Sequence, residues 1–161
     1  MRLFPLFIIF SVVCIDYFSK IYVQNILKNQ THLILNDYMI LEKTYNKGII
    51  FSIAHSNSIF INYFILFVLT IIILYLIYIF IHILPRLNNY LIIAWSFLIG
   101  GGLGNFVDRI IDNKVFDFII IHYKDIYFPG VFNLADSFIS VALAMILFEY
   151  FFTQDEKNYK I

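Results

Sequence analysis

Hydrophobic and polar positions along the chain form long apolar stretches separated by shorter polar ones. A membrane-spanning α-helix needs about 20 mostly apolar residues. Four stretches have this length, and their approximate ranges are 3–26, 59–84, 90–107 and 133–152. The second of them carries no Asp, Glu, Lys or Arg. The pattern therefore predicts four transmembrane helices in a single domain that covers residues 1–161.

The first stretch has a second interpretation, as a cleaved leader. Arg2 followed by an apolar run up to Cys14 resembles a secretory or lipoprotein signal. Against this, Val12 and Val13 are bulky where a cleavage site needs small residues, and apolar sequence continues beyond them. We therefore expect a retained helix.

Two long connections, about 27–58 and 108–132, join the predicted helices. The first contains the strand-like runs "HLIL" and "YMILEKTY" with "ND" between them as a turn signal. The second contains "VFDFIII" and the turn signal Pro129-Gly130. We expect small structured elements at the membrane surface, the first a short β-sheet, and hence a membrane all-α fold with a small β element.

Polar residues gather on the side of these long connections. Four spans place both termini on one side and both long connections on the other, so this follows from the number of spans alone. The residues concerned are Asp16, Lys20, Asn105, Asp108, Arg109, Asn133 and Asp136. Ionisable groups inside a span are costly and normally face the bundle interior. The pattern therefore predicts one polar pocket near the membrane surface.

Helical spacing supports this pocket. Asp16 and Lys20 stand four residues apart, the favourable order for an ion pair. Asn105, Asp108 and Arg109 are spaced to share one helix face. In the run 100–104, Gly100 and Gly104 form a small-xxx-small pair that allows a neighbouring helix to approach closely.

Composition agrees with a membrane protein and excludes several classes. Apolar residues make up 61% and charged residues 14% of the chain, where about 25% charged is typical. The net charge is zero, so no overall field favours nucleic acid. One cysteine excludes an internal disulfide, and no His/Cys cluster has zinc-site spacing. We expect no metal and no cofactor. Lys and Arg counts do not fix the orientation.

Paired carboxylates are the best catalytic material near the predicted pocket. The acids within reach are Asp16, Asp108, Asp112, Asp117 and Asp136. Two carboxyl groups held close together do not both ionise easily, so one acts as a general acid and the other as a general base. Apolar flanks favour a desolvated Asp117, whereas Arg109 would pair with Asp108. The residues favour Asp117 with Asp136, with Asp108 and Asp136 as the second choice.

Five motifs resemble those of the lipoprotein signal peptidases (signal peptidase type II), in the same order. "DYFSK" at 16–20 resembles acid-Gln-x-Thr-Lys, and "NKGIIFS" at 46–52 resembles Asn-x-Gly-x-x-Phe-Ser. "GGGLGNFVDR" at 100–109 resembles Gly-Gly-x-x-Gly-Asn-x-x-Asp-Arg. "VFDF" at 115–118 resembles Val-x-Asp-Phe, and "FNLADS" at 132–137 resembles Phe-Asn-x-Ala-Asp-Ser. The resemblance covers nearly the whole chain.

The resemblance implies an aspartic endopeptidase of the bacterial cytoplasmic (inner) membrane that acts without a cofactor. It implies four transmembrane helices, an extracytoplasmic β-cradle, a short surface helix and cytoplasmic termini. The implied partners are membrane lipid and a diacylglyceryl-modified prolipoprotein, which is cut before its lipidated cysteine. We expect a monomer.

The resemblance also assigns roles to residues. The implied catalytic residues are Asp117 and Asp136, the substrate-binding residues are Asn46, Asn105, Arg109 and Asn133, and the supporting residues are Asp16, Lys20, Gly48 and Asp108. The chain departs from the family pattern at Tyr17, where Gln is usual, and at Ile49 and Ile50, where small residues are common. These departures bear on substrate preference and leave the acids unchanged.

Two other function classes use the same residues. A small transporter or proton-pathway protein also needs intramembrane acids, but it needs ionisable groups on both sides of the bilayer midplane. A structural subunit of a membrane complex could assemble through the glycines, and it would lose assembly rather than chemistry when charges are changed.

Overall fold

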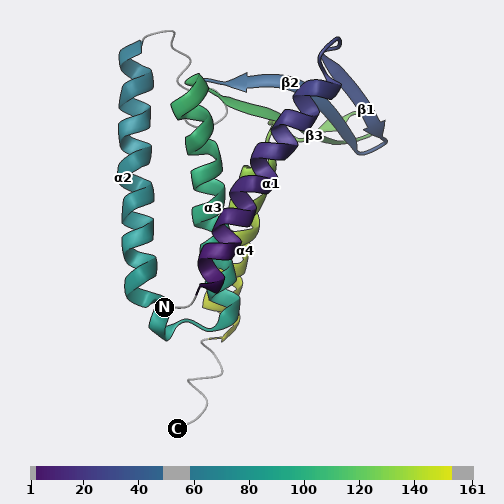
Figure 1. Cartoon of the computed structure of the whole chain (residues 1–161). Coiled ribbons are helices and arrows are strands. Elements are labelled where there is room, and N and C mark those ends of the chain that lie inside the picture. Colours follow the sequence, from purple (N-terminus) through teal and green to yellow (C-terminus); the bar gives the residue numbers. More distant parts are fainter. Residues whose placement is uncertain (1–2, 49–58, 154–161) are drawn as a thin grey trace.

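The computed structural model describes residues 3–48 and 59–153 and contains a helical bundle with a small sheet at one end (Figure 1). The helices are α1 (Phe4–Ile26), α2 (Ile59–Ile83), α3 (Asn89–Asp112) and α4 (Leu134–Thr153), with a 3₁₀ turn, η1 (Leu84–Arg86). The strands are β1 (His32–Asn36), β2 (Met39–Asn46), β3 (Val115–Tyr123) and β4 (Ile126–Tyr127).

The four long helices are long and apolar enough to cross a membrane, which confirms the four predicted spans. Their outer faces carry large exposed hydrophobic side chains such as Phe7, Phe10, Phe60 and Phe67, as expected of surfaces that contact lipid. The start of α1 and the end of α4 lie at the end of the bundle opposite the sheet (Figure 1).

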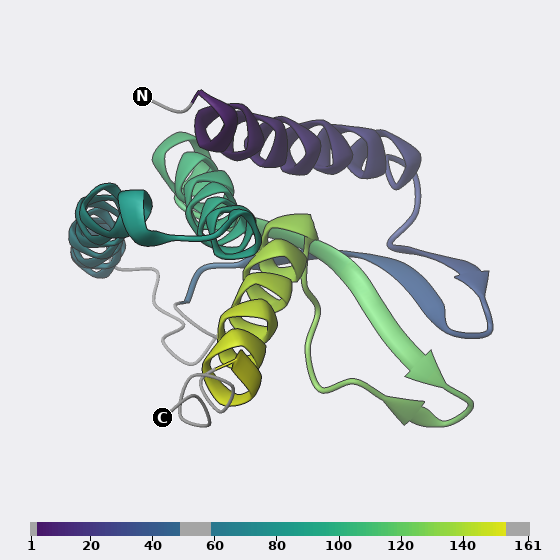
Figure 2. The ribbon, with the colours of Figure 1, turned by 90° about the horizontal axis from the view of Figure 1, so that it is seen from below.

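Helix α3 is the central helix of the bundle, since it packs against α1, α2 and α4 (Figure 2). Its glycines make this close packing possible. A Cβ added at Gly100 would lie 2.8 Å from Val12 Cβ of α1, and one at Gly104 would lie 2.7 Å from Asp16 Oδ2. Both distances are shorter than real contacts allow, so the predicted role of this small-xxx-small pair in helix packing is confirmed.

The two long connections meet in one antiparallel sheet with the order β1-β2-β3-β4. The predicted hairpin is present, and its turn is closed by Asn36, whose Oδ1 accepts a hydrogen bond of 2.8 Å from the Tyr38 N–H. The strand-like run in the second connection becomes β3 and pairs with β2, a pairing that the sequence did not specify. This pairing brings the site residues of the two connections together.

The sheet is anchored to the bundle by an apolar cluster. Val23 and Leu27 at the end of α1 pack against Leu41 of β2 and against Phe116 and Phe118 of β3. Burial of such side chains stabilises by about 1.5–3 kcal/mol each. The half of β3 that begins at Val115 is buried, so it is held firmly beside the ends of α1 and α3.

Two features differ from the sequence-based expectation. Helix α3 continues to Asp112 rather than ending near residue 107, because its stop is Asn113, which adopts a left-handed conformation (φ 55°) and donates its N–H to the Arg109 carbonyl. Asp108 therefore lies in the helix and not in the connection. The expected short surface helix does not occur within residues 3–48 and 59–153; the departures at Ile49 and Ile50 lie outside the described residues.

Candidate active site

Asp117 lies in the buried part of β3, opposite Thr44 of β2. Its side chain is 3% exposed. Asn133 Nδ2 donates to Asp117 Oδ1 at 2.7 Å, and the Asn46 side chain forms a further hydrogen bond with it. Desolvation by burial and, after it, the charge of the nearby Asp136 raise the pKa of Asp117 from 3.8 to about 7, although the two amide hydrogen bonds oppose the rise. Asp117 therefore holds its proton close to neutral pH.

Asp136 is fixed at the start of α4 by a reciprocal pair of hydrogen bonds with Asn133. The Asp136 N–H donates to Asn133 Oδ1 at 2.9 Å, and the Asn133 N–H donates to Asp136 Oδ2 at 3.2 Å. This is the geometry of a capping box, with Asp in the position usually taken by Glu or Gln. Asn133 is fully buried and contacts both acids.

Asn105 of α3 connects this pair to the rest of the bundle. Its Nδ2 donates to the second oxygen of Asp136, Oδ1, at 2.8 Å. Its Oδ1 accepts hydrogen bonds from Asn133 Nδ2 at 3.0 Å and from Lys20 Nζ at 3.3 Å. Both the nitrogen and the oxygen of the Asn105 amide are therefore held in place, and Asn105 and the Asn133 N–H together position the Asp136 carboxylate.

The predicted pair of Asp16 and Lys20 is present, with 2.6 Å between Asp16 Oδ2 and Lys20 Nζ, and both side chains are buried. The other oxygen of Asp16, Oδ1, accepts the Ala135 N–H at 2.9 Å. Because Ala135 lies in the first turn of α4, Asp16 satisfies one of the free N–H groups there. The pair thus connects α1 to the start of α4 without contacting Asp117.

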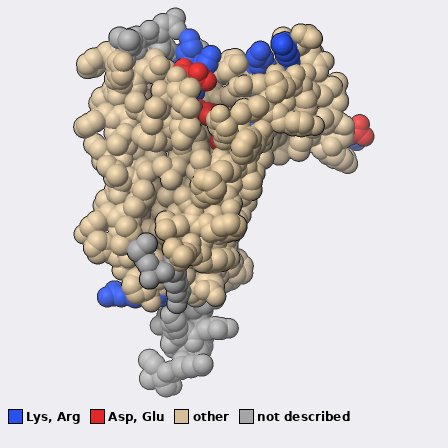
Figure 3. Space-filling view, in the orientation of Figure 1, with Lys and Arg blue, Asp and Glu red and all other residues tan. Residues whose placement is uncertain are grey.

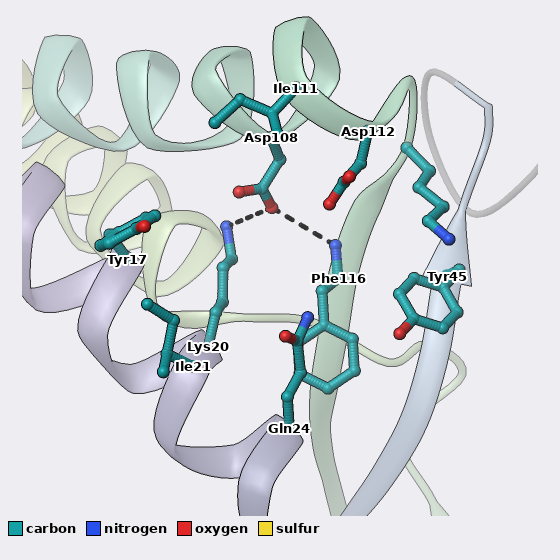
Figure 4. A pocket seen from close by; sticks show the side chains of 10 residues that line it. Tyr17, Lys20, Ile21, Gln24, Tyr45, Asp108, Ile111, Asp112 and Phe116 are labelled. Carbon is teal, nitrogen blue, oxygen red and sulfur yellow. Dashed lines mark hydrogen bonds and ion pairs between the residues drawn. The ribbon is translucent and has the colours of Figure 1, made fainter. Parts of the chain in front are cut away.

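Asp108 pairs with Lys20 (2.9 Å), not with Arg109 as the sequence suggested. Neighbouring residues on a helix point in different directions. Figure 4 shows the Asp108 carboxylate between Lys20 and the Phe116 N–H, which donates to it at 3.3 Å. The cavity drawn in Figure 4 has a volume of about 180 Å³ and is lined by Asp108 but not by Asp117 or Asp136. The ion pair of Asp108 with Lys20 disfavours the second-choice pair of Asp108 with Asp136.

Arg109 points instead toward the segment after β2. Its Nη2 donates to the Gly48 carbonyl, and the Gly48 N–H donates to Asn46 Oδ1 at 2.9 Å. Asn46 therefore closes a turn with Gly48 and also contacts Asp117. Arg109, Gly48 and Asn46 fix the end of β2 next to the acids.

Two cavities meet at the acids, and Asn46, Asp117 and Asp136 line both. The first, which we name the α2–α3 cavity, has about 340 Å³ and runs between these helices. The second, which we name the β3–α4 cavity, has about 520 Å³ and lies between β3, the segment 128–132 and the first turns of α4. The lining residues Phe128 and Val131 were not predicted, because only the Pro129-Gly130 turn signal marked this segment.

On one face of the molecule, the visible charged side chains lie at its two ends. On the face shown in Figure 3, acidic side chains appear only at the sheet end, and the sides of the helices are uncharged. Within the described residues, no group of three or more His, Cys, Asp or Glu side chains could hold a metal ion. The arrangement supplies two carboxyl groups, one of them protonated near neutral pH, beside two open cavities.

Comparison with known proteins places the chain among membrane peptidases. The family model described as "Signal peptidase (SPase) II" matches residues 8–152. A "Lipoprotein signal peptidase" of Rickettsia africae is 35% identical over 149 residues, which cover 91% of this chain and 72% of the relative. Its counterpart in Pseudomonas syringae pv. tomato is 31% identical over 152 residues, which cover 93% of this chain and 87% of the relative.

Solved structures share the fold. A chain described as a bacterial membrane enzyme solved by the in meso method at 2.3 Å has a TM-score of 0.75 and 24% identity, with 99% of this chain and 93% of that chain covered. A second, solved at 1.9 Å, has a TM-score of 0.74 and 23% identity, with 94% and 95% covered.

Proposed function

Because this chain belongs to the signal peptidase II family, we propose that it removes signal peptides from diacylglyceryl-modified prolipoproteins as an aspartic endopeptidase. Family membership supports a peptidase that acts on prolipoproteins. The aspartic mechanism is supported by one observation above all: Asp117 and Asp136 share a binding partner, Asn133, and both line the same two cavities.

The proposed chemistry divides one proton between two carboxyl groups. Asp117, with a pKa of about 7, holds the proton, and Asp136 supplies the carboxylate. Asp136 takes a proton from water as the water oxygen attacks the scissile carbonyl carbon, and Asp117 donates its proton to the carbonyl oxygen. Collapse of the gem-diol intermediate breaks the C–N bond as the proton on Asp136 passes to the leaving nitrogen, and one hydroxyl of the gem-diol returns its proton to Asp117 as the carboxylic acid forms. Both protons are accounted for, with no covalent intermediate.

The polar groups around the acids suit a bound peptide backbone. Asn46, Asn105 and Asn133 carry amides that both donate and accept hydrogen bonds, and Arg109 adds further donors. All three amides already form a hydrogen bond with Asp117 or Asp136. In the proposed complex they satisfy peptide groups that would otherwise be desolvated at the membrane surface.

The location of the acids fits a lipidated substrate. Asp136 lies in the first turn of α4, at the sheet end of the bundle. A diacylated cysteine keeps its acyl chains in the bilayer and its scissile bond near the headgroups. We propose that cleavage occurs immediately before that cysteine, at the extracytoplasmic face of the bacterial inner membrane. Both termini then lie in the cytoplasm. The working form is proposed to be a monomer.

The test is cleavage of a purified diacylated prolipoprotein by Asp117→Asn and Asp136→Asn. Each variant keeps the size and hydrogen-bonding shape of the side chain but loses the proton chemistry, so we expect a rate at least roughly 100-fold lower. The matched control is Asp112→Asn, which changes an exposed Asp at the end of α3 and should cleave at the normal rate.

Three results would contradict the proposal. Near-normal cleavage by either variant would exclude the pair of acids as the catalytic groups. Equal cleavage of an unlipidated precursor would exclude the lipidated substrate class. Loss of cleavage in a chelator, restored by added metal, would indicate a metallohydrolase instead.

A further inference from the structure

The α2–α3 cavity continues from the acids into the transmembrane part of the molecule. Its upper end is polar, and its lower part is lined by Leu69, Ile72, Ile73 and Leu76 of α2 and by Leu98 of α3. From Leu98 to Arg109 the cavity follows α3 for about 16 Å, at 1.5 Å per residue. An occupant would have to be polar at one end and aliphatic along its length.

The acyl chains of the substrate have this chemistry. They are attached to the cysteine that follows the scissile bond, so they must leave the acids toward the bilayer. The β3–α4 cavity is also largely apolar, with Ile139 and Val141 beside Ser137 and Ser140 on its α4 wall, but its other walls come from β3 and the segment 128–132 rather than from a second span. The α2–α3 cavity, which lies between two spans, is thus the better match for acyl chains.

Gly102 occupies a special position in this cavity. The neighbouring glycines are required by packing, since a Cβ at Gly100, Gly101 or Gly104 would lie 2.6–2.8 Å from another atom. A Cβ at Gly102 would meet only Ile73 Cγ1, at 3.9 Å, among the described residues. This is an ordinary van der Waals distance, so helix packing there accepts a side chain. The missing side chain leaves space in the cavity instead.

We propose that Gly102 is a specificity-determining residue that sets how long an acyl chain the α2–α3 cavity accepts. The proposal rests on the proposed function, because it concerns the substrate of the same site. Gly102 lies one helical turn below Asn105, and a larger side chain at this position closes the aliphatic part of the cavity below the acids. Short chains would still fit above it.

The experiment uses one precursor peptide whose cysteine carries either two octanoyl or two hexadecanoyl chains, mixed in the same detergent micelles. The readout is the ratio of kcat/KM for the long-chain and short-chain forms. Gly102→Leu should lower this ratio roughly tenfold or more, since a few methylene groups discriminate by that factor in an apolar pocket. Gly102→Ala, whose Cβ fits, should change it little.

Two further variants serve as controls. Ser140→Leu narrows the β3–α4 cavity and should affect both substrates equally. Ile73→Ala removes the side-chain atom nearest to Gly102. As a single variant it should raise the ratio of kcat/KM for the long-chain and short-chain forms. Combined with Gly102→Leu, it should return the lowered ratio toward the value of the unmodified enzyme. Because Ile73→Ala keeps the glycine, it tests the proposal even if Gly102→Leu does not fold.

The outcomes separate this inference from the function on which it rests. If the unmodified enzyme cleaves neither lipopeptide, the proposed function fails. If it cleaves both, but neither Gly102→Leu nor Ile73→Ala changes the ratio, Gly102 does not set chain-length preference and the inference is overturned.

Discussion

Asn133 shows how one side chain can organise two acids from separate elements. Its Nδ2 donates to Asp117 of β3, and its backbone N–H and Oδ1 bind Asp136 of α4. Since Asn133 is fully buried, neither contact is exchanged easily for water. The cap of α4 therefore helps to set the relative position of the two carboxyl groups.

The raised pKa of Asp117 predicts a pH-dependent stability. The folded state holds a proton on Asp117 up to about pH 7, whereas the unfolded state loses it near pH 3.8. Between these values the folded state binds more protons, so the free energy of unfolding falls as the pH rises from about 4 to about 7. The shift corresponds to roughly 4 kcal/mol at most.

Asp117→Asn removes this penalty, because Asn is neutral at every pH. We expect the variant to unfold at a higher temperature than the unmodified protein at pH 8, and we expect a smaller difference at pH 5 and almost none at pH 3. Thermal unfolding in detergent measures the difference, and Asp112→Asn serves as the exposed control. If Asp117→Asn and the unmodified protein unfolded at the same temperature at pH 8, the ionised Asp117 side chain would not destabilise the folded state, and its pKa would not be raised by burial.

Helix α3 is the element on which the site depends most. It carries Asn105 and Arg109, and its glycine face brings α1 and α4 close enough for their polar groups to meet. A Cβ at Gly101 would lie 2.6 Å from the Ala135 carbonyl oxygen and 2.8 Å from Ile139 Cγ1. The first of these atoms is backbone, next to Asp136, so it cannot move without moving the start of α4.

Gly101→Ala should therefore lower both stability and cleavage, with a stability loss of about 1–3 kcal/mol from overpacking. Gly102→Ala is the matched control one residue away. It should keep the stability or raise it by up to about 1 kcal/mol, because Ala favours helix over Gly. Thermal unfolding and cleavage of a diacylated precursor measure both effects. Equal behaviour of the two variants would contradict the assigned packing.

The whole molecule is divided into an uncharged band and a polar end. The described acids that face the site lie at the sheet end, and the sides of the helices are apolar (Figure 3). A proton pathway needs ionisable groups across the full thickness of the bilayer. This one-sided distribution favours a reaction at the membrane surface over transport through it.

The proposed orientation can be tested on the intact molecule. In a Cys14→Ser background, Asp125→Cys labels the β3–β4 turn and Arg86→Cys labels η1 at the opposite end. A maleimide that cannot cross membranes should react with the first position and not with the second when it is added to spheroplasts. The reverse pattern would place the sheet and the acids on the cytoplasmic side.

Much of the architecture could be predicted from the chain itself. The spans, the β1–β2 hairpin and the pair of Asp16 with Lys20 all depend on local properties: apolar length, turn residues and helical spacing. The one-sided gathering of polar groups follows from an even number of spans. The preference for Asp117 rested on its apolar neighbours in the sequence, and it agrees with the burial of Asp117 in β3.

Only the tertiary structure decided which polar groups meet. Asp108 pairs with Lys20 rather than with its neighbour Arg109, and Asn133 joins Asp117 to Asp136. The sequence also could not separate Gly102 from the glycines that packing requires. The reason is physical: hydrophobicity and spacing act within a segment, whereas these contacts depend on how closely α1, α3, α4 and β3 approach one another in the folded bundle.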